Sequence, residues 1–405
     1  MTSTWTTTTI GALAHVSRGA SPRPIASPRW FDSSGDVRWV RIADVNRSNG
    51  RTLLATTQAL SADGVARSRY LKPGTLIMSI AATVGIPVIT GVPACIHDGF
   101  VSLENLKANK RFMLYLLKAS EPRLREAGQS GSQMNVNSDI VRGLTVRIPS
   151  SVEEQARVAS VLWDLDDLIV SLENAIVKKR AIKQGVMQEL LTGRTRLRGF
   201  TDEWSTRSLS TFGTFLRGGG IKRDEVRQAG VPCIRYGEIY TTFEDYTIST
   251  VSFVSGSVAA MALPLRSGDI LFAGSGETKA EIGMNVAYIG DTPAVAGGDI
   301  IVLRGTEYDP VYLATLLNTP ELANQKARGG QGDAVVHINW RVLAGLEVTV
   351  PELPEQHAIA QVLIDADDEI AALQRRLDAT RAIKQGMMHE LLSGRTRLAV
   401  KEDAA

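Results

Sequence analysis

Basic and amide side chains cluster in two stretches of the sequence. The first cluster contains Arg18, Arg23, Arg41, Asn46 and Arg47. The second contains Arg217, Lys222, Arg223, Arg235, Tyr236 and Lys279. Arginine can donate two parallel hydrogen bonds to guanine, amide side chains pair with adenine, and both bind phosphate. We therefore predict both clusters as DNA contacts. Arg51 is a further member of the first cluster. The alternative is that all these residues only keep the surface soluble.

A glycine-rich segment in the second half offers a different chemistry. Residues 269–278 (DILFAGSGET) resemble the loop with which methyltransferases hold S-adenosylmethionine, since glycines after a strand let the backbone approach a cofactor. However, the sequence has no Asn/Asp-Pro-Pro-aromatic tetrad, and the matching residues 79–85 (SIAATVG) lack the glycine pattern. Residues 274–279 also do not have Walker A spacing. We therefore expect a loop at a strand end, no cofactor and no catalytic residue.

Histidine and cysteine are too scattered to predict a metal site. No two of the histidines have helical i, i+4 spacing, and neither cysteine belongs to a CxxC or Cys/His cluster. These residues are His15, His97, His337, His357 and His389, with Cys95 and Cys233. Two distant cysteines also argue against a disulfide framework and indicate a reducing, cytoplasmic location.

The charge and hydropathy of the chain set further limits. The net charge is only +2, so any DNA-binding surface must be a local patch. Residues 76–96 carry no charge and approach the length of a membrane span. Gly85, Pro87, Gly91 and Pro93 interrupt this run, which favours buried strands over a transmembrane helix. We therefore expect no membrane contact.

The sequence contains one long segment twice. Residues 154–197 and 355–398 are identical at 25 of 44 positions when the chain is shifted by 201 residues. Both copies contain the letters RAIKQG, at 180–185 and 381–386, and GRTRL, at 193–197 and 394–398. A repeat this long is not a solenoid unit. It indicates two halves that each end in the same helical element.

Apolar residues in both copies follow a heptad pattern. Successive steps of four and three residues connect Val158, Leu162, Leu165, Ile169, Leu172 and Ile176, and likewise Ile359, Leu363, Ala366, Ile370, Leu373 and Leu377. Such a narrow stripe is typical of a coiled coil. A helix of roughly 38 residues would be roughly 57 Å long, which suits a spacer.

Polar residues modify this coiled-coil pattern. Lys179 and Lys183 interrupt the first stripe, and Thr380 and Lys384 the second, which would fix the register of a helix pair. Asp164, Asp166 and Asp167, repeated as Asp365, Asp367 and Asp368, flank the stripe. We interpret them as a solvated face, and the alternative is a contact surface for a partner helix. Gly193 and Gly394 stand where a helix C-cap is expected.

The regions before each helix are two mixed α/β heads with drifted sequences. Strands are expected at 39–42, 76–80 and 144–149 and a helix at 111–119 in the first head. The second head repeats this order, from Trp204 for Trp5 to the proline-closed strand 346–351. A polar loop at 128–133 recurs at 329–333. We predict boundaries at 1–150 and 200–351 for the heads and at 151–199 and 352–405 for the helices.

This layout resembles the specificity subunits of Type I restriction-modification systems. The resemblance is carried by the repeated AIKQG and GRTRL segments, and by Glu154-Gln155 and Glu355-Gln356 after a proline-closed strand. It implies two target recognition domains, each reading one half of a split sequence of double-stranded DNA. Their helices would form an antiparallel coiled coil that sets the unread spacer, with pseudo-twofold symmetry between the halves.

The resemblance also implies partner chains. Catalysis would belong to a DNA methylation subunit, bound along the repeated helices in two copies, and to a restriction subunit that uses ATP, so this chain would not be an enzyme. The predicted partner-binding residues are Arg180, Lys183, Gln184, Arg194, Arg196, Arg381, Lys384, Gln385, Arg395 and Arg397. Two alternatives stay open: an S-adenosylmethionine-dependent DNA methyltransferase with fused recognition domains, and a coiled-coil scaffold that binds no nucleic acid.

Overall fold

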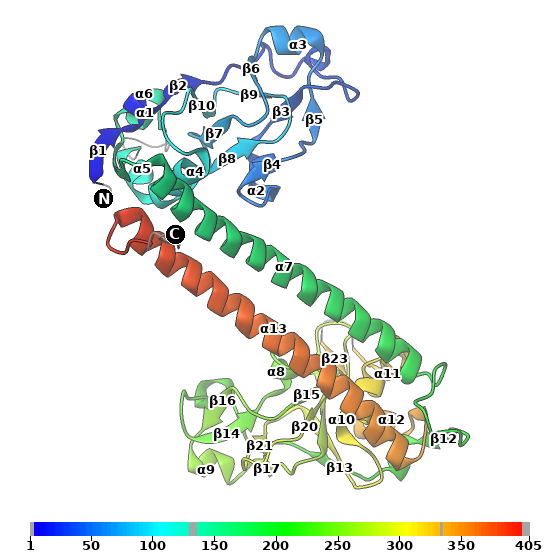
Figure 1. The fold of residues 1–405 in the computed structure, drawn as a ribbon. Helices are drawn as coiled ribbons and strands as arrows, with labels where there is room; N and C mark the ends of the chain where they lie inside the picture. Colours follow the sequence, from blue (N-terminus) through cyan, green and yellow to red (C-terminus); the bar gives the residue numbers. More distant parts are fainter. Residues whose placement is uncertain (1–3, 129–135, 333–334, 399–405) are drawn as a thin grey trace. The chain divides into compact units, whose positions relative to one another are not determined.

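The computed structural model describes residues 4–128, 136–332 and 335–398. The chain divides into two units, one made of residues 1–175 and 373–405 and the other of residues 176–372 (Figure 1). Each unit contains one head and a segment of both long helices. A unit is therefore not one head with only the helix that follows it.

The head of unit 1 is a mixed α/β domain. Its strands are β1 (Trp5–Thr9), β2 (His15–Arg18), β3 (Arg38–Val40), β4 (Thr52–Leu53), β5 (Gln58–Ala59), β6 (Arg69–Leu71), β7 (Leu76–Ser79), β8 (Pro87–Thr90), β9 (Ala94–Ile96), β10 (Phe100–Glu104) and β11 (Thr145–Pro149). Its helices are α1 (Ile10–Leu13), η1 (Pro28–Trp30), α2 (Ile42–Arg47), α3 (Ala62–Ala66), α4 (Lys110–Ala119), α5 (Glu121–Ala127) and α6 (Ser138–Gly143). Residues 129–133 of the expected polar loop lie outside the described residues.

A central sheet in this head is buried on both faces. Its strand order is β2-β10-β7-β8-β4, and a second sheet has the order β5-β3-β9-β6. Alternate residues of β7 point in opposite directions, so Leu76 and Met78 pack with α4 and the long helices. Ile77 packs with Val40 and Ile96 of the second sheet. This explains the uncharged run 76–96, which forms β7, β8 and β9.

The head of unit 2 repeats this architecture. Its strands are β12 (Ser205–Ser208), β13 (Thr214–Arg217), β14 (Val231–Ile234), β15 (Tyr246–Thr247), β16 (Ser252–Val254), β17 (Leu263–Pro264), β18 (Asp269–Ala273), β19 (Ser275–Gly276), β20 (Asn285–Tyr288), β21 (Val295–Ala296), β22 (Ile300–Arg304), β23 (Val336–His337) and β24 (Glu347–Val350). Its helices are η2 (Leu209–Thr211), η3 (Arg223–Glu225), α8 (Tyr236–Thr241), α9 (Gly256–Ala259), α10 (Pro310–Leu317), α11 (Pro320–Gly329) and α12 (Trp340–Ala344). Residue 333 of the second expected loop is not among the described residues.

The sheet topology confirms the internal repeat. The central sheet has the order β13-β22-β18-β20-β15 and the second sheet β16-β14-β21-β17, which match the two sheets of unit 1 strand by strand. In β18, Ile270 and Phe272 face α10, whereas Leu271 and Ala273 face the second sheet. The heads therefore share a framework although their sequences have drifted.

The predicted long helices are confirmed. Helix α7 spans Val152–Leu190, 39 residues, and α13 spans Leu353–Ser393, 41 residues. Every heptad residue named above is buried or half-buried. Gly193 and Gly394 follow the helices with φ of +68° and +75°, the left-handed conformation of a glycine C-cap.

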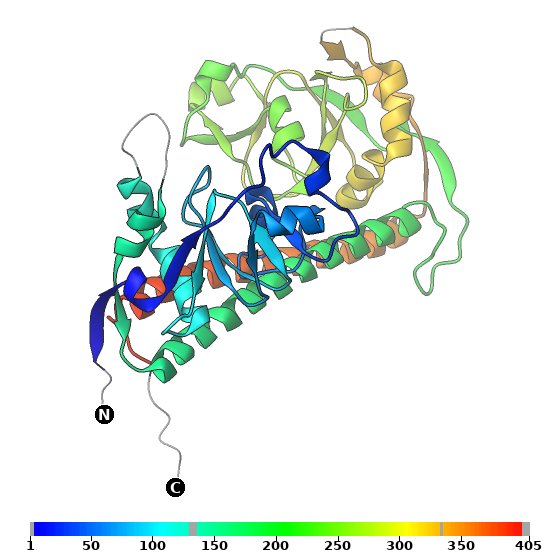
Figure 2. The same ribbon diagram turned by 90° about the horizontal axis from the view of Figure 1, so that it is seen from above.

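The helix segments pair antiparallel within each unit (Figures 1 and 2). In unit 1, Asp166 and Glu173 of α7 bind Lys384 and Arg381 of α13, both at 2.6 Å, so rising numbers on α7 meet falling numbers on α13. In unit 2, Lys179 and Lys183 of α7 bind Glu369 and Asp367 of α13 at 2.7 and 2.5 Å in the same sense. The lysines on the stripe thus fix the register, as predicted.

Two of the flanking aspartates do not belong to a solvated face. Asp166 is 8% exposed and also accepts a hydrogen bond from the Tyr115 hydroxyl at 2.6 Å. Burial and the neighbouring Asp166 raise the pKa of Tyr115, so the phenol stays protonated and donates. Asp367 likewise accepts from Tyr246 at 3.2 Å. The interpretation was wrong for this pair because each carboxylate meets a lysine and a tyrosine.

The GRTRL segments bind the beginning of the opposite helix. In unit 2, Arg196 after α7 donates to Glu355 at the start of α13, with both hydrogen bonds at 2.6 Å. In unit 1, Arg397 binds Glu154 at 2.9 Å. The GRTRL segment and the glutamate that begins each repeat therefore serve to form an arginine–carboxylate pair, which is bidentate in unit 2.

Buried glutamines attach each helix to its own head. Gln155 donates to Pro149 O and accepts from Asn109 N, both at 2.8 Å. Gln356 makes the same bonds to Pro351 and Asp309.

Among the described residues, no helix is long and apolar enough to cross a membrane.

We predict that Asp166→Ala destabilises unit 1 by about 3 kcal/mol, because it leaves Lys384 and the buried Tyr115 hydroxyl without their acceptor. Asp164→Ala, on the exposed side of the same helical turn, is the matched control and should change stability by less than about 0.5 kcal/mol. Urea denaturation measures both. Equal stability of the two variants would contradict the buried ion pair.

Candidate nucleic-acid interface

An arginine and a glycine close the first strand of the central sheet in each head. Arg18 ends β2 and Arg217 ends β13, and both are exposed. The following Gly19 and Gly218 donate their N–H to Phe100 O and Ile300 O, both at 2.9 Å. A Cβ on either glycine would lie only 2.0 or 2.1 Å from a backbone oxygen, so no side chain fits. Each head therefore has an Arg-Gly pair at a tight backbone crossing, where a second chain segment lies against the glycine.

Basic loops leave this crossing in both heads. In unit 1, Asp98 holds the loop, because Ser21 donates to its carboxylate at 3.0 Å and Arg23 at 3.1 Å. Arg18 donates to the Asp98 backbone oxygen at 2.8 Å. In unit 2, Lys222 and Arg223 are exposed in the matching loop.

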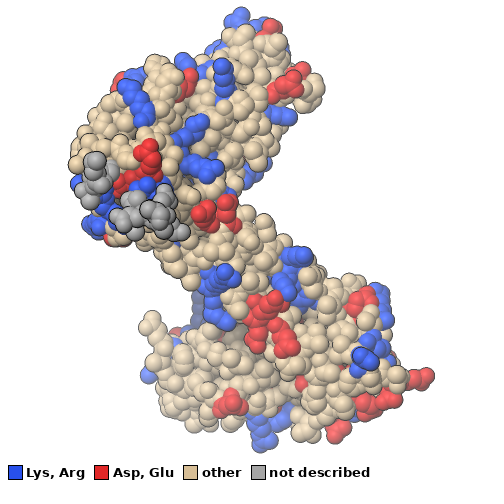
Figure 3. Space-filling view, in the orientation of Figure 1, with Lys and Arg blue, Asp and Glu red and all other residues tan. Residues whose placement is uncertain are grey.

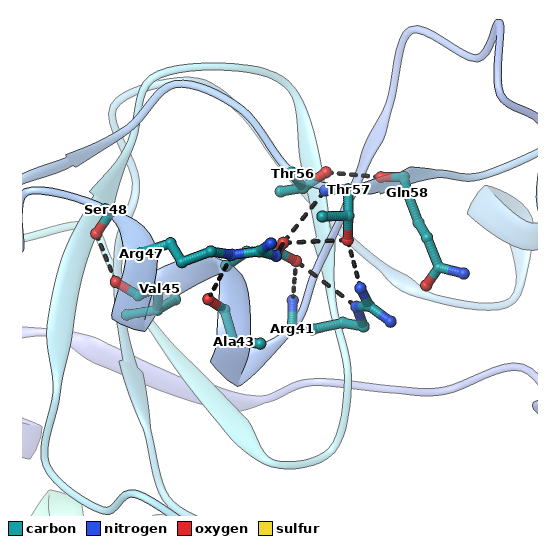
Figure 4. A network of polar contacts seen from close by, with 9 residues as sticks. Arg41, Ala43, Val45, Arg47, Ser48, Thr56, Thr57 and Gln58 are labelled. Atoms are coloured by element: carbon teal, nitrogen blue, oxygen red, sulfur yellow. Dashed lines mark hydrogen bonds and ion pairs between the residues drawn. The ribbon is translucent and has the colours of Figure 1, made fainter. Parts of the chain in front are cut away.

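A second arginine precedes a short helix in each head. The expected strand 39–42 ends at Val40, and Arg41 is instead the N-cap of α2, since its backbone N–H donates to Asp44 at 3.1 Å. Arg235 stands before α8 in the same way and donates to Glu238 at 3.0 Å. Arg47 closes α2 and donates to Asp44 at 2.8 Å (Figure 4). Asn46, the preceding residue, is exposed.

The structure gathers most predicted contacts of unit 2 along two adjoining hollows. One, of about 500 Å³, is lined by Arg217, Asp299 and Trp340. The other, of about 590 Å³, is lined by Arg223, Arg235 and Tyr236 and also reaches Asp299. Lys279 is exposed but lines neither hollow, and Lys222 also lies outside them.

A buried lysine holds the segment that carries Lys279. Lys326 is buried in the head of unit 2 and donates to Gly283 O at 2.8 Å and to Asn285 Oδ1 at 3.2 Å. Burial lowers the pKa of Lys326 to about 7. The two hydrogen bonds of its Nζ atom anchor the chain where it enters β20.

The predicted contacts of unit 1 form two groups. Arg18 and Arg23 meet at Asp98, whereas Arg41 and Arg47 meet at Asp44. Arg47 also lines a hollow of about 430 Å³ with Asn49, Leu54 and Thr57. Arg51 is 5% exposed and binds Asp167 of α7 at 2.7 Å, so its inclusion among surface residues was wrong.

Sequence reasoning missed the two carboxylates that hold these arginines. Asp44 and Glu238 are each 4% exposed, and each stands three residues after its arginine. This is the spacing of a capping box, which was the available signal.

On the face shown in Figure 3, basic and acidic side chains are interspersed over each unit, as expected from the small net charge.

The predicted partner-binding residues divide into two classes. Lys183, Lys384, Arg196, Arg397 and Arg381 form the ion pairs within the units described above. Exposed side chains make up the second class, namely those of Arg180, Gln184, Gln385, Arg194 and Arg395.

The glycine-rich segment does not have the geometry of a cofactor loop. Strand β18 is antiparallel to both of its neighbours, β20 and β22. Ser275 and Gly276 then pair with β23 rather than opening a helix. The residues that the structure describes also contain no group of His, Cys, Asp or Glu that could hold a metal ion.

Comparisons with known proteins agree on one family. Residues 2–181 and 201–380 match the family described as the type I restriction modification DNA specificity domain. The chain is 23% identical over 331 residues to the type I restriction enzyme MjaVIII specificity subunit of Methanocaldococcus jannaschii, covering 77% of this chain and 76% of that protein. A putative MjaX specificity subunit of the same organism is 22% identical over 338 residues, covering 77% and 75%.

Solved structures share the fold. An S subunit of a type I restriction-modification system from M. genitalium superposes with a TM-score of 0.60 and 14% identity, covering 96% of both chains. The HsdS subunit from Thermoanaerobacter tengcongensis gives a TM-score of 0.53 and 16% identity, covering 97% of both chains.

We predict that Gly218→Ala lowers the stability of unit 2 by about 2 kcal/mol, because the new methyl group would overlap the Gly297 oxygen. Gly219→Ala is the control, since no atom lies within 4 Å of a Cβ there, and it should cost less than about 0.5 kcal/mol. Urea denaturation separates the two. A Gly218 variant as stable as its neighbour would show that the crossing is not tight.

Proposed function

The chain belongs to the family of type I restriction-modification DNA specificity domains, and on this premise we propose that each of its heads reads one half of a split DNA target. The main support is the matched pair of arginine sites in heads of equal topology. Arg41 and Arg235 occupy the same position before a short helix. The side chains on these helices differ between the heads, with Arg47 on α2 in the first and Tyr236 on α8 in the second. One framework with different side chains is what two readers of two sequences require.

In this proposal, arginines at the strand ends bind phosphate and those at the short helices read bases. Arg18, Arg23, Arg217, Lys222 and Arg223 lie on the loops after the first central strand, where they can orient a head on the backbone. Arg41, Asn46, Arg47, Arg235 and Tyr236 lie on α2 and α8, and Lys279 lies on the segment before β20. Short helices with arginine and amide side chains suit the donor and acceptor pattern of the major groove.

The four segments have separate tasks in this proposal. Residues 1–150 and 200–351 recognise DNA, and the helical segments 151–199 and 352–405 set the number of unread base pairs between the half-sites. An unbroken helix of 39 residues is about 58 Å long, more than the roughly 34 Å of one DNA turn. Nothing about the β18 loop supports a fused methyltransferase.

Methyl transfer and ATP-dependent cleavage would then belong to a methylation subunit and a restriction subunit. We propose that two methylation subunits bind an outward helix face, which we define as Ala181, Ile182, Gln184 and Gly185 with their repeats Ala382, Ile383, Gln385 and Gly386. All eight residues are exposed, and the four types are identical in both copies. Ile182 and Ile383 are 49% and 54% exposed, which is unfavourable in water without a partner.

We expect that replacing residues 1–150 with the head of another family member changes one half of the recognised sequence and leaves the other half and the spacer intact. Methylome sequencing of the host, with the native or the chimaeric gene, reads both halves together. An unchanged target sequence would contradict recognition by the heads.

Ile182→Lys should remove one methylation subunit from the complex, and adding Ile383→Lys should remove both, because each lysine places a charge on an apolar contact. Native mass spectrometry of the reconstituted complex counts the subunits. Val177→Lys is the control, since Val177 is 67% exposed on the same helix but is replaced by Asp378 in the second copy. Full occupancy in the double variant would exclude the outward helix face.

A further inference from the structure

Each head contains a buried carboxylate at the third residue of its short helix. Asp44 in α2 and Glu238 in α8 are both 4% exposed. A carboxylate this deeply buried is unfavourable unless hydrogen bonds and cations compensate for the lost hydration. The groups that compensate it are the arginines assigned above to base reading.

Asp44 binds more groups than a helix cap requires. A cap needs only the bond from the Arg41 backbone N–H to Asp44 Oδ2. Asp44 Oδ1 additionally accepts from Arg47 Nη2 at 2.8 Å, and from the backbone and hydroxyl of Thr57, both at 3.2 Å (Figure 4). Arg41 Nη2 in turn donates to the Thr57 hydroxyl. One carboxylate therefore connects two arginines to the loop that follows β4.

These bonds leave a defined edge of Arg47 free. Its Nε donates to Ala43 O at 3.1 Å and its Nη2 to Asp44, which uses the side of the guanidinium nearest the helix. Three of the five N–H donors, two on Nη1 and one on Nη2, remain available. The side chain is 60% exposed and lines the hollow beside Leu54 and Asn49. This end of a guanidinium matches the O6 and N7 acceptors of guanine.

We propose that Asp44 is a positioning residue that holds Arg47 for bidentate reading of a guanine in the half-site of the first head. This inference rests on the proposed function. Holding the guanidinium before DNA binds reduces the conformational entropy that binding would otherwise cost. The same carboxylate holds Thr57 in the loop after β4, and the exposed Leu54 of this loop lines the same hollow as the arginine.

The second head also has a buried carboxylate that binds an arginine, but the side chains around it are different. Glu238 accepts from Arg235 Nε at 2.9 Å and from the Ser252 hydroxyl, so it connects the arginine to β16. Thr241 stands where the first head has Arg47, and the exposed Tyr236 stands beside Arg235. The guanine contact of Arg47 therefore belongs to one half-site only, and the two heads differ in the side chains attached to a common carboxylate.

The test measures base preference with the full chain assembled with its methylation subunits. Binding to a library of duplexes, randomised one position at a time within the target, gives the preference for guanine at each position. We expect Arg47→Ala to lower one guanine preference in one half about tenfold, and to leave the other half unchanged. Arg47→Lys should lower the same preference although it keeps the charge, because an ammonium group cannot donate in the bidentate geometry.

Asp44→Asn should weaken the same position as Arg47→Ala, and the double variant should lose no more than Arg47→Ala alone, because Asp44 acts through Arg47. Asp139→Asn is the matched control, since Asp139 also pairs with an arginine three residues on, Arg142, but is 79% exposed. It should change no preference.

Loss at different positions for the two variants, or additive losses, would overturn the positioning role of Asp44. So would an Asp44 variant that fails to assemble, since the carboxylate would then serve the fold. Unchanged guanine preference in Arg47→Ala, with the rest of the target still recognised, would overturn the guanine contact. A wild-type complex without any sequence preference would instead overturn the proposed function, and this inference with it.

Discussion

The fold depends on the antiparallel pairing of helix segments that are distant in sequence. The central sheet of each head has two apolar faces, and its second sheet covers only one of them. The other face needs α4 or α10 and the ends of both long helices, including Leu391 and Leu392 in unit 1 and Leu190 and Leu191 in unit 2. Because burial of this surface is the main driving force for folding, each unit needs a segment from outside its own half of the sequence.

Ion pairs make this pairing specific. Apolar heptad residues alone allow neighbouring registers, whereas a lysine on the stripe is satisfied in one register only. Lys183 with Asp367, and Lys384 with Asp166, are equivalent pairs in the two units, and so are the arginine–glutamate pairs of the GRTRL segments. The most similar residues of the two halves are thus largely those that join them. Among the other identical residues, the exposed Ala181, Ile182, Gln184 and Gly185 with their repeats form the outward helix face.

Much of this organisation could be predicted from the sequence, because periodicity and repetition are local signals. The heptad steps predicted both long helices, and the glycine caps followed from their positions after the last apolar pair. The strands of the heads were predicted only in part, since several have two or three residues and no readable period. Asp44 escaped prediction because an aspartate near arginines is ordinarily a solvated partner, and only the fold shows that it is buried. The solvated reading of Asp166 failed for the same reason.

The strands β7 and β18 are covered on both faces, which restricts where the two heads are free to differ. A polar residue on either strand would lose its hydration without gaining a partner. Substitutions are therefore tolerated mainly at the rims of the sheets. The basic loops, the short helices and the turn after β4 all lie on such rims. Related proteins must therefore keep the buried strands, whereas the side chains at the sheet edges are free to change. A new recognised sequence does not require a new fold.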